Sequence, residues 1–231
     1  MTATVSVVIP ALNEAKTLPE NVARVLACRS VAEVIVVDGG STDGTVEALV
    51  RKDSEINPGR LKILSSSPGR PEQMNLGARQ AKGEWLLFHH ADSILDCEAV
   101  DAISVLPDTC QWGGFKHSFY PNNWKLKIVS WLHNFRWRCT GVIYGDQSMF
   151  VRRTFFEHLG GFMEDTLEDL EFSDRALEHA PSILLPFNVR TDSRKFLQIG
   201  EFRALFQVFV ILWRYERDRG VGVAEFFKPY R

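Results

Sequence analysis

The chain has no strong excess of charge of either sign. It contains 27 lysines and arginines and 29 aspartates and glutamates, so the formal net charge is −2. This balance excludes a generally basic nucleic-acid-binding protein, and we expect no nucleic-acid partner. The 45% hydrophobic and 24% charged residues are ordinary globular composition, which excludes a disordered chain.

Long apolar runs are also missing. No segment approaches the roughly 18 apolar residues of a membrane-spanning helix, and the longest candidate is Val208–Trp213. The first residues lack the basic region and the long apolar region of a secretory signal peptide. We therefore expect a cytoplasmic protein, with peripheral contact at the inner face of the membrane as an open alternative.

Cysteine is scarce. The four cysteines are Cys28, Cys97, Cys110 and Cys139, and no two of them form a CxxC pair. This spacing argues against a zinc cluster. We interpret all four as buried thiols of a protein from a reducing compartment.

Apolar strands and amphipathic helices alternate through the first hundred residues. We predict strands at Val5–Ile9, Val34–Val37, Leu61–Leu64 and Trp85–Phe88. We predict helices around residues 18–26, at Thr45–Arg51 and at Pro71–Lys82, the last ended by Gly83. This alternation predicts an α/β fold with a mostly parallel central sheet flanked by helices. Ligands of such sheets bind beyond the carboxyl ends of the strands, here Pro10–Glu14, Asp38–Gly44 and His89–Asp92.

The pattern changes after about residue 108. Residues 112–150 are rich in aromatic and basic side chains and predict mixed strands with a helix near Trp124–Phe135. Further helices are expected at Arg153–Leu159, from Glu168, and at Phe202–Arg217. Because no linker separates the halves, we expect residues 1–231 to form one domain with a shared sheet.

The turn Asp38–Thr45 follows a strand and opens a helix. Its glycines permit a ligand close to the backbone, and the helix N-terminus favours anionic groups. Asp38 could accept hydrogen bonds from a base or a ribose. The alternative is a plain strand–helix turn capped by Asp43.

Two short segments with acidic side chains are candidates for chemistry. In His89-His90-Ala91-Asp92, the carboxylate suits Mg²⁺ or Mn²⁺ beside a diphosphate, and the imidazole favours Mn²⁺. Alternatively, Asp92 caps the next segment and the histidines are partly buried. In Glu168-Asp169-Leu170-Glu171, the acids could complement a helix dipole or supply a general base.

An aromatic and basic stretch lies in the second half. It comprises Trp124, Trp131, Phe135, Arg136, Trp137 and Arg138. Such side chains could hold an acceptor or a lipid headgroup. The interpretation we favour is a core helix with a solvated basic face, and the stripe Phe202–Trp213 is interpreted as core as well.

Together these segments resemble the family 2 glycosyltransferases, which have the GT-A fold. The resemblance rests on four blocks in order, Val5–Glu14, Val36–Thr45, Gly69–Ala78 and Ala81–Phe88. A narrower resemblance, to the short bacterial rSAM/selenodomain-associated glycosyltransferases, covers nearly the whole chain. It rests on His90–Asp92, Tyr144–Gln147, Phe150–Arg153, Gly160–Phe162, Leu167–Glu171 and Pro229–Arg231.

The resemblance implies a role for each matching residue. Pro10, Ala11, Glu14, Asp38, Arg70 and Ala91 would bind the donor. Asp92, with His90 in place of the first acid of the family's DxD motif, would bind a divalent cation, Mn²⁺ or Mg²⁺. Asp169 would be the catalytic base, with Glu168 beside it. Asp146, Gln147 and Arg138 are weaker candidates on the acceptor side, and Arg194 is a further one.

The implied activity is transfer of a sugar, with inversion, from a UDP-sugar or GDP-sugar to a hydroxyl of a small-molecule or lipid-linked acceptor. Residues 1–107 would bind the nucleotide-sugar and residues 108–231 the acceptor. The incomplete metal motif leaves a catalytically inactive nucleotide-sugar-binding or scaffold protein as the alternative. A nucleotidyltransferase is disfavoured because Ala11–Glu14 is acidic and not glycine-rich.

Overall fold

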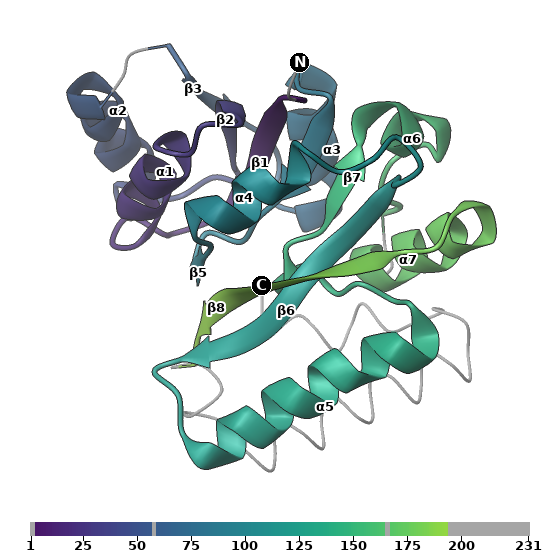
Figure 1. The fold of residues 1–231 in the computed structure, drawn as a ribbon. Helices are drawn as coiled ribbons and strands as arrows, with labels where there is room; N and C mark the ends of the chain where they lie inside the picture. Colours follow the sequence, from purple (N-terminus) through teal and green to yellow (C-terminus); the bar gives the residue numbers. More distant parts are fainter. Residues whose placement is uncertain (1–2, 57–58, 165–166, 194–231) are drawn as a thin grey trace.

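The fold is built on one eight-stranded sheet with the order β3-β2-β1-β4-β7-β6-β8-β5 (Figure 1). The computed structural model describes residues 3–56, 59–164 and 167–193. The strands are β1 (Val5–Ala11), β2 (Val31–Asp38), β3 (Leu61–Ser65), β4 (Trp85–Phe88), β5 (Ser93–Ile94), β6 (Trp112–Tyr120), β7 (Phe150–Arg152) and β8 (Ile183–Asp192).

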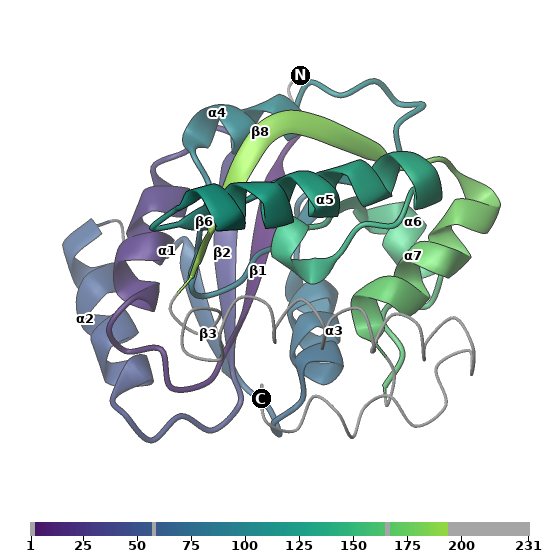
Figure 2. The same cartoon turned by 90° about the horizontal axis from the view of Figure 1, so that it is seen from below.

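Helices cover both faces of this sheet. They are α1 (Leu18–Leu26), α2 (Thr45–Ile56), α3 (Arg70–Gln80), α4 (Cys97–Ile103), α5 (Trp124–Thr140), α6 (Arg153–His158) and α7 (Glu168–His179). A short 3-10 turn, η1 (Gly145–Gln147), precedes β7. Figure 2 shows α1 and α2 on one side, α3 and α7 on the other, and α5 across β6.

The predicted parallel half of the sheet is confirmed. β1 pairs in parallel with β2 and β4, and β2 pairs in parallel with β3. The second half is mixed, because β7 is antiparallel to both β4 and β6, while β8 runs parallel to β6. One continuous sheet thus joins the two halves of the chain.

The sheet separates two apolar clusters. Alternate residues of β1 point to opposite faces, so Val7 packs with α1, α2 and α4, while Val8 packs with α3, α6 and α7. A Cβ at Gly77 would lie 2.4 Å from Cγ1 of Val8, so α3 approaches the sheet this closely because it has glycine there. This contact positions the N-terminal end of α3 at the strand ends.

The expectation of four buried thiols is wrong. Cys28 and Cys97 form a disulfide that joins the end of α1 to the start of α4, and Cys139 is exposed. Only Cys110, of the four, is a buried thiol. The two bonded cysteines are separated by 69 positions in sequence, so their pairing depends on the packing of α1 and α4 and is not visible in the spacing.

Two helix predictions need correction. α3 ends at Gln80, before Lys82, so Gly83 does not end it. Gly83 instead lets the chain pass close to β1, since a Cβ there would lie 2.6 Å from the backbone nitrogen of Ser6. The interpretation of α5 as a core helix is also wrong. Among its residues only Leu126 and Ser130 are buried, and five large apolar side chains are exposed.

Several expectations lie outside the described residues. These are the helix Phe202–Arg217, the segment Val208–Trp213, Arg194 and the terminal motif Pro229–Arg231. Within the described ranges, every helix is too short or too polar to cross a bilayer.

Candidate active site

The ends of β1 and β2 hold the predicted donor-binding residues side by side. Ala11 pairs with Asp38, and the Gly39 N–H donates to the Ala11 carbonyl at 2.9 Å. The Asp38 carboxylate is buried and accepts from the Gly40 N–H and the Ser41 N–H, each at 3.0 Å. Asp38 therefore shapes its own turn and presents it beyond the sheet.

The loop after β1 is bound to the turn after β2. The Glu14 N–H donates to Oγ1 of Thr45 at 2.9 Å, and the Thr42 N–H donates to Oδ1 of Asn13 at 2.9 Å. Asn13 has a positive φ of 57°, which asparagine tolerates better than most residues. The structure thus brings Pro10, Ala11 and Glu14 into one rigid edge with Asp38.

The first turn of α3 connects this edge to the acids of the second half. Nε2 of Gln73 donates to the carbonyls of Ala11 at 3.0 Å and of Val37 at 2.7 Å. Arg70, one turn earlier, extends to the other side, where its Nε lies 3.4 Å from Oε1 of Glu168. Gln73 was not predicted as a site residue. The structure reveals it, because its polar side chain is buried although it lies on a helix.

The end of β4 is fixed by His89 and Ala91. Nδ1 of His89 lies 2.8 Å from the Ser148 hydroxyl, and Nε2 lies 2.9 Å from the Ser93 carbonyl. Burial lowers the pKa of His89 to about 4, so the ring is neutral near pH 7 and its Nε2–H donates to Ser93. The Ala91 carbonyl accepts from the Asn21 amide at 2.7 Å. His89 is therefore structural and, at 1% exposure, more deeply buried than the alternative for this motif expected.

His90 and Asp92 were the predicted metal ligands. Nε2 of His90 contacts the Arg70 guanidinium, which can only donate, so in this arrangement the imidazole lone pair is directed at Arg70. Asp92 is half-buried just beyond β4. Within the part of the chain that the structure describes, no three histidine, cysteine or acidic side chains converge as a metal cluster. One carboxylate nevertheless fits Mg²⁺ or Mn²⁺ where a substrate diphosphate completes the coordination.

The pair Glu168 and Asp169 begins α7 beside the turn η1. Oδ2 of Asp169 accepts from the Gly145 N–H at 2.7 Å, and Oδ1 accepts from the Leu170 N–H at 2.9 Å. Burial and the neighbouring charge of Glu168 raise the pKa of Asp169 to about 6, although the Gly145 N–H and Arg70 oppose this rise. A carboxylate with such a pKa can accept a proton near neutral pH.

A group of histidines surrounds Asp146 on η1. Oδ1 of Asp146 lies 3.1 Å from Nε2 of His133 on α5, and Oδ2 lies 3.8 Å from Nε2 of His117 on β6. Burial opposes ionisation of Asp146, but the charges of the two histidines outweigh it and hold its pKa below the usual range. Burial lowers the pKa of His117 to about 4. The sequence indicated neither histidine, because they lie 16 positions apart on different elements.

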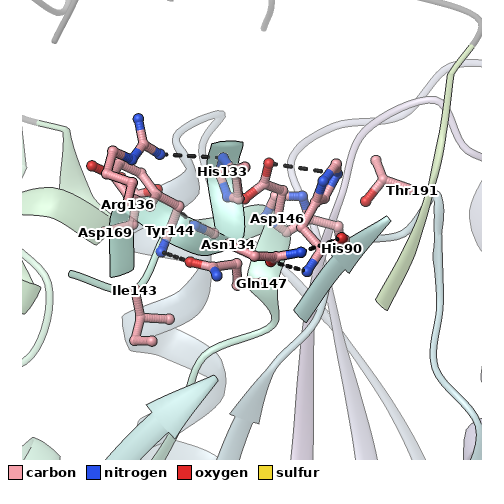
Figure 3. Close-up of polar contacts among 12 residues, drawn as sticks. His90, His133, Asn134, Arg136, Ile143, Tyr144, Asp146, Gln147, Asp169 and Thr191 are labelled. Atoms are coloured by element: carbon pink, nitrogen blue, oxygen red, sulfur yellow. Dashed lines mark hydrogen bonds and ion pairs between the residues drawn. The ribbon is translucent and has the colours of Figure 1, made fainter. Parts of the chain in front are cut away.

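Arg136 of α5 and Tyr144, just before η1, are the remaining site residues from the second half of the chain (Figure 3). The Arg136 guanidinium lies 3.6 Å from the centre of the Tyr144 ring and donates to Nδ1 of His133 at 3.2 Å. Burial lowers the pKa of Arg136 and raises that of Tyr144 to about 12. Both side chains lie next to Asp169 in the close-up.

The three weaker acceptor-side candidates have different positions. Asp146 lies in the group around η1. Gln147 is fully buried and its amide oxygen accepts from the Tyr144 N–H at 3.0 Å, so it shapes the turn from inside. Arg138 is exposed, and helical spacing places it away from the side of α5 that carries Leu126 and His133. The structure does not bring Arg138 to the other candidates.

The sequence matches the family described as glycosyl transferase family 2 over residues 6–159. A poly(ribitol-phosphate) beta-N-acetylglucosaminyltransferase TarS of Staphylococcus aureus is 31% identical over 108 residues, which are 45% of this chain and 18% of the relative. A poly-beta-1,6-N-acetyl-D-glucosamine synthase of the same species is 32% identical over 88 residues, 38% of this chain and 21% of the relative. The matches thus span about a fifth of these relatives.

Solved structures show the same fold. The mannosyltransferase PcManGT from Pyrobaculum calidifontis, in complex with GDP-Man and Mn²⁺, aligns with a TM-score of 0.71 at 22% identity, covering 99% of this chain and 68% of that one. TarS residues 1–349 of S. aureus in complex with UDP-GlcNAc aligns at 0.64 and 22% identity, covering 83% and 59%. The architecture is therefore the GT-A fold. With the family match covering well over half of its residues, this chain belongs to glycosyl transferase family 2.

Proposed function

We propose that this protein moves a sugar from a nucleotide-diphosphate-sugar to an acceptor hydroxyl with inversion at the anomeric carbon. The observation that carries the proposal is the setting of Asp169. Its carboxylate is oriented by two backbone N–H groups, and its pKa is raised to about 6. Its neighbour Glu168 is paired with Arg70, the first residue of α3, and α3 is hydrogen-bonded to the ends of β1 and β2. This is the arrangement that a general base needs beside a bound donor.

The donor site is the edge formed by Ala11, Asp38 and the loop containing Glu14. Ala91 and Arg70 lie on the side of this edge that is nearer to Glu168 and Asp169. Backbone groups held at strand ends suit a nucleotide, and the fixed turn costs no ordering when the ligand binds. Structural neighbours hold GDP-Man or UDP-GlcNAc, which supports a GDP-sugar or a UDP-sugar here.

Asp169 takes the proton from the acceptor hydroxyl as that oxygen attacks the anomeric carbon opposite the leaving diphosphate. Each Asp169 oxygen accepts one backbone N–H and keeps a lone pair for the incoming hydroxyl. Glu168 remains paired with Arg70, and its negative charge keeps Asp169 basic.

Asp92 would hold a divalent cation, Mn²⁺ or Mg²⁺, which when bound supplies positive charge against the diphosphate. The guanidinium of Arg70 is a second positive group on the same side of the site, shared between His90 and Glu168. We place donor binding in residues 1–107 and acceptor binding in residues 108–231, with Asp146 on the acceptor side.

The test uses the full chain with UDP-sugars and GDP-sugars, and measures nucleotide release with water or added hydroxyl compounds as acceptor. Asp169→Asn keeps the shape of the side chain but removes the base, and we expect activity to fall by about 10²–10⁴-fold. Glu178→Gln, an exposed carboxylate on the same helix, is the control and should leave activity unchanged.

Proton NMR of the new glycosidic bond gives its anomeric configuration, and retention would contradict the direct displacement. Undiminished activity in Asp169→Asn would contradict the assigned base. Tight donor binding by the wild type without turnover on any acceptor would favour an inactive nucleotide-sugar-binding protein instead.

A further inference from the structure

Helix α5 exposes a continuous apolar stripe. We call its members Trp124, Ile128, Trp131, Leu132 and Phe135 the outer face of α5. They follow a helical spacing of three or four residues, and all are exposed, with Trp124 at 69% and Trp131 at 61%. The rings of Trp131 and Phe135 stack at 5.3 Å between centroids. This exposed surface extends along a helix of 17 residues, about 25 Å long.

The opposite side of α5 is engaged with the protein. Leu126 and Ser130 are buried, and the indole N–H of Trp137 donates to the Ser182 hydroxyl at 2.9 Å. The Asn134 amide is hydrogen-bonded to both the N–H and the carbonyl of His117 on β6. The helix is therefore fixed in rotation, and the outer face is directed away from the sheet.

The charges carried by α5 and the residues next to it in sequence have one sign. No aspartate or glutamate occurs between Asp108 and Asp146, whereas this stretch contains five basic residues, Lys116, Lys125, Lys127, Arg136 and Arg138. Lys127 and Arg138 are exposed and lie four and seven residues from Trp131, so they border the outer face. This concentration contrasts with a net charge of −2 for the whole chain.

We propose that the outer face of α5 lies on an anionic lipid bilayer. Tryptophan and phenylalanine rings bordered by lysine and arginine are the composition of helices that lie in the headgroup region. Negative lipid headgroups complement the basic border, and α5 itself carries no acid that would be repelled by them.

Bilayer contact would bring the site close to the membrane surface. α5 is a single helix, about 10–12 Å thick. On its inner side, His133 contacts Asp146. Arg136 lies over the ring of Tyr144, beside Asp169. The acceptor class that follows is a hydroxyl presented at the headgroup level. This consequence rests on the proposed function, whereas the bilayer contact itself does not.

The test is flotation of the full chain with vesicles of phosphatidylcholine alone and of phosphatidylcholine mixed with phosphatidylglycerol. We expect binding only to the anionic vesicles, weakened by salt. Trp131→Ser with Phe135→Ser should reduce binding by at least tenfold. Lys127→Gln with Arg138→Gln should reduce it about fivefold for each charge removed.

Matched controls are available elsewhere on the surface. Val50→Ser with Val105→Ser makes the same apolar-to-polar change at exposed positions on α2 and after α4, and Arg51→Gln with Arg79→Gln removes two exposed charges. Both should bind vesicles as the wild type does. The nucleotide-induced thermal shift should be unchanged in every variant, so loss of vesicle binding is separable from failure of the donor site.

Absence of flotation with anionic vesicles, or equal loss in the control variants, overturns the proposal. The proposal is also overturned if the wild type does not bind vesicles and the Trp131→Ser, Phe135→Ser variant melts at a lower temperature than the wild type. That result would mean that the outer face packs against protein and not against lipid. Sedimentation velocity would then show whether a second copy of the chain covers it.

Discussion

The backbone N–H of Gly145 donates to Oδ2 of Asp169 at 2.7 Å, although the two residues are 24 positions apart in sequence. This bond joins the 3-10 turn η1 to the first turn of α7. On the other side of Gly145, Nε2 of His90 and Nη2 of Arg70 are so close that a Cβ would lie 2.9 Å and 3.2 Å from them. The orientation of the proposed base therefore depends on a position without a side chain.

Gly145→Ala should lower turnover and also weaken donor binding, because Arg70 is a proposed donor contact. The added methyl group displaces His90 and Arg70, or moves η1 and with it the N–H that orients Asp169. A displacement of about 1 Å at a reacting group can cost on the order of 10²-fold in rate. Steady-state kinetics would measure the loss of turnover, and the thermal shift with the nucleotide would measure the loss of donor binding. Normal turnover would show that η1 does not position the base.

The rate should rise with pH through about 6 and level off above, because Asp169 accepts a proton only when it is ionised and its pKa is raised to about 6. Glu168→Gln removes the neighbouring negative charge, so the pKa of Asp169 should fall and the acid limb should move to lower pH. A pH profile of kcat/KM for wild type and variant measures this shift. Glu178→Gln is the control, and an acid limb that stays in place in Glu168→Gln would contradict the assignment.

Gln73→Leu should destabilise the protein and weaken nucleotide binding. The amide is buried and donates to the carbonyls of Ala11 and Val37, and its loss leaves these acceptors with fewer partners, at about 1–3 kcal/mol. For a chain of this size, the melting temperature falls by about 2–4 °C per kcal/mol. Gln80→Leu, exposed at the end of the same helix, should have little effect. Equal melting temperatures for the two variants would argue against this role.

Asp92→Asn should remove the metal-dependent part of nucleotide binding. We would follow the melting temperature with UDP, GDP, ADP, CMP or dTDP in Mn²⁺, Mg²⁺ or EDTA. A ligand at about 100 times its Kd adds roughly 2.7 kcal/mol, which corresponds to about 5–10 °C here. Asp96→Asn, an exposed acid four residues away, should keep the metal-dependent shift. A wild-type shift that is the same in EDTA would contradict a metal on Asp92.

The first half of the chain was predictable because its information is local. The apolar run at Val5–Ile9 and the stripe through Leu18 and Val22 have the periods of a strand and a helix, and the structure has β1 and α1 there. The position of Asp38 was predictable for the same reason, since a carboxylate at a strand end followed by glycines is visible along a few consecutive residues, whereas its role in donor binding stays a prediction. The match to the family covers residues 6–159, which include these segments.

The second half was less predictable because its contacts join distant elements. β8 pairs in parallel with β6 across more than 60 residues, a relation that no local pattern indicates. The composition of α5 indicated a helix but left its orientation open, and the core interpretation failed because aromatic side chains favour burial and interfaces alike.

The strand–helix alternation, the turn at Asp38 and the acidic start of α7 at Glu168 can be predicted from sequence, because each depends on neighbours within one or two turns of chain. The bond between Cys28 and Cys97, the histidines His133 and His117 around Asp146, and the position of Arg70 between His90 and Glu168 appear only once the chain is folded. The physical reason is that such contacts depend on sheet register and helix packing, which sum many weak interactions over the whole chain.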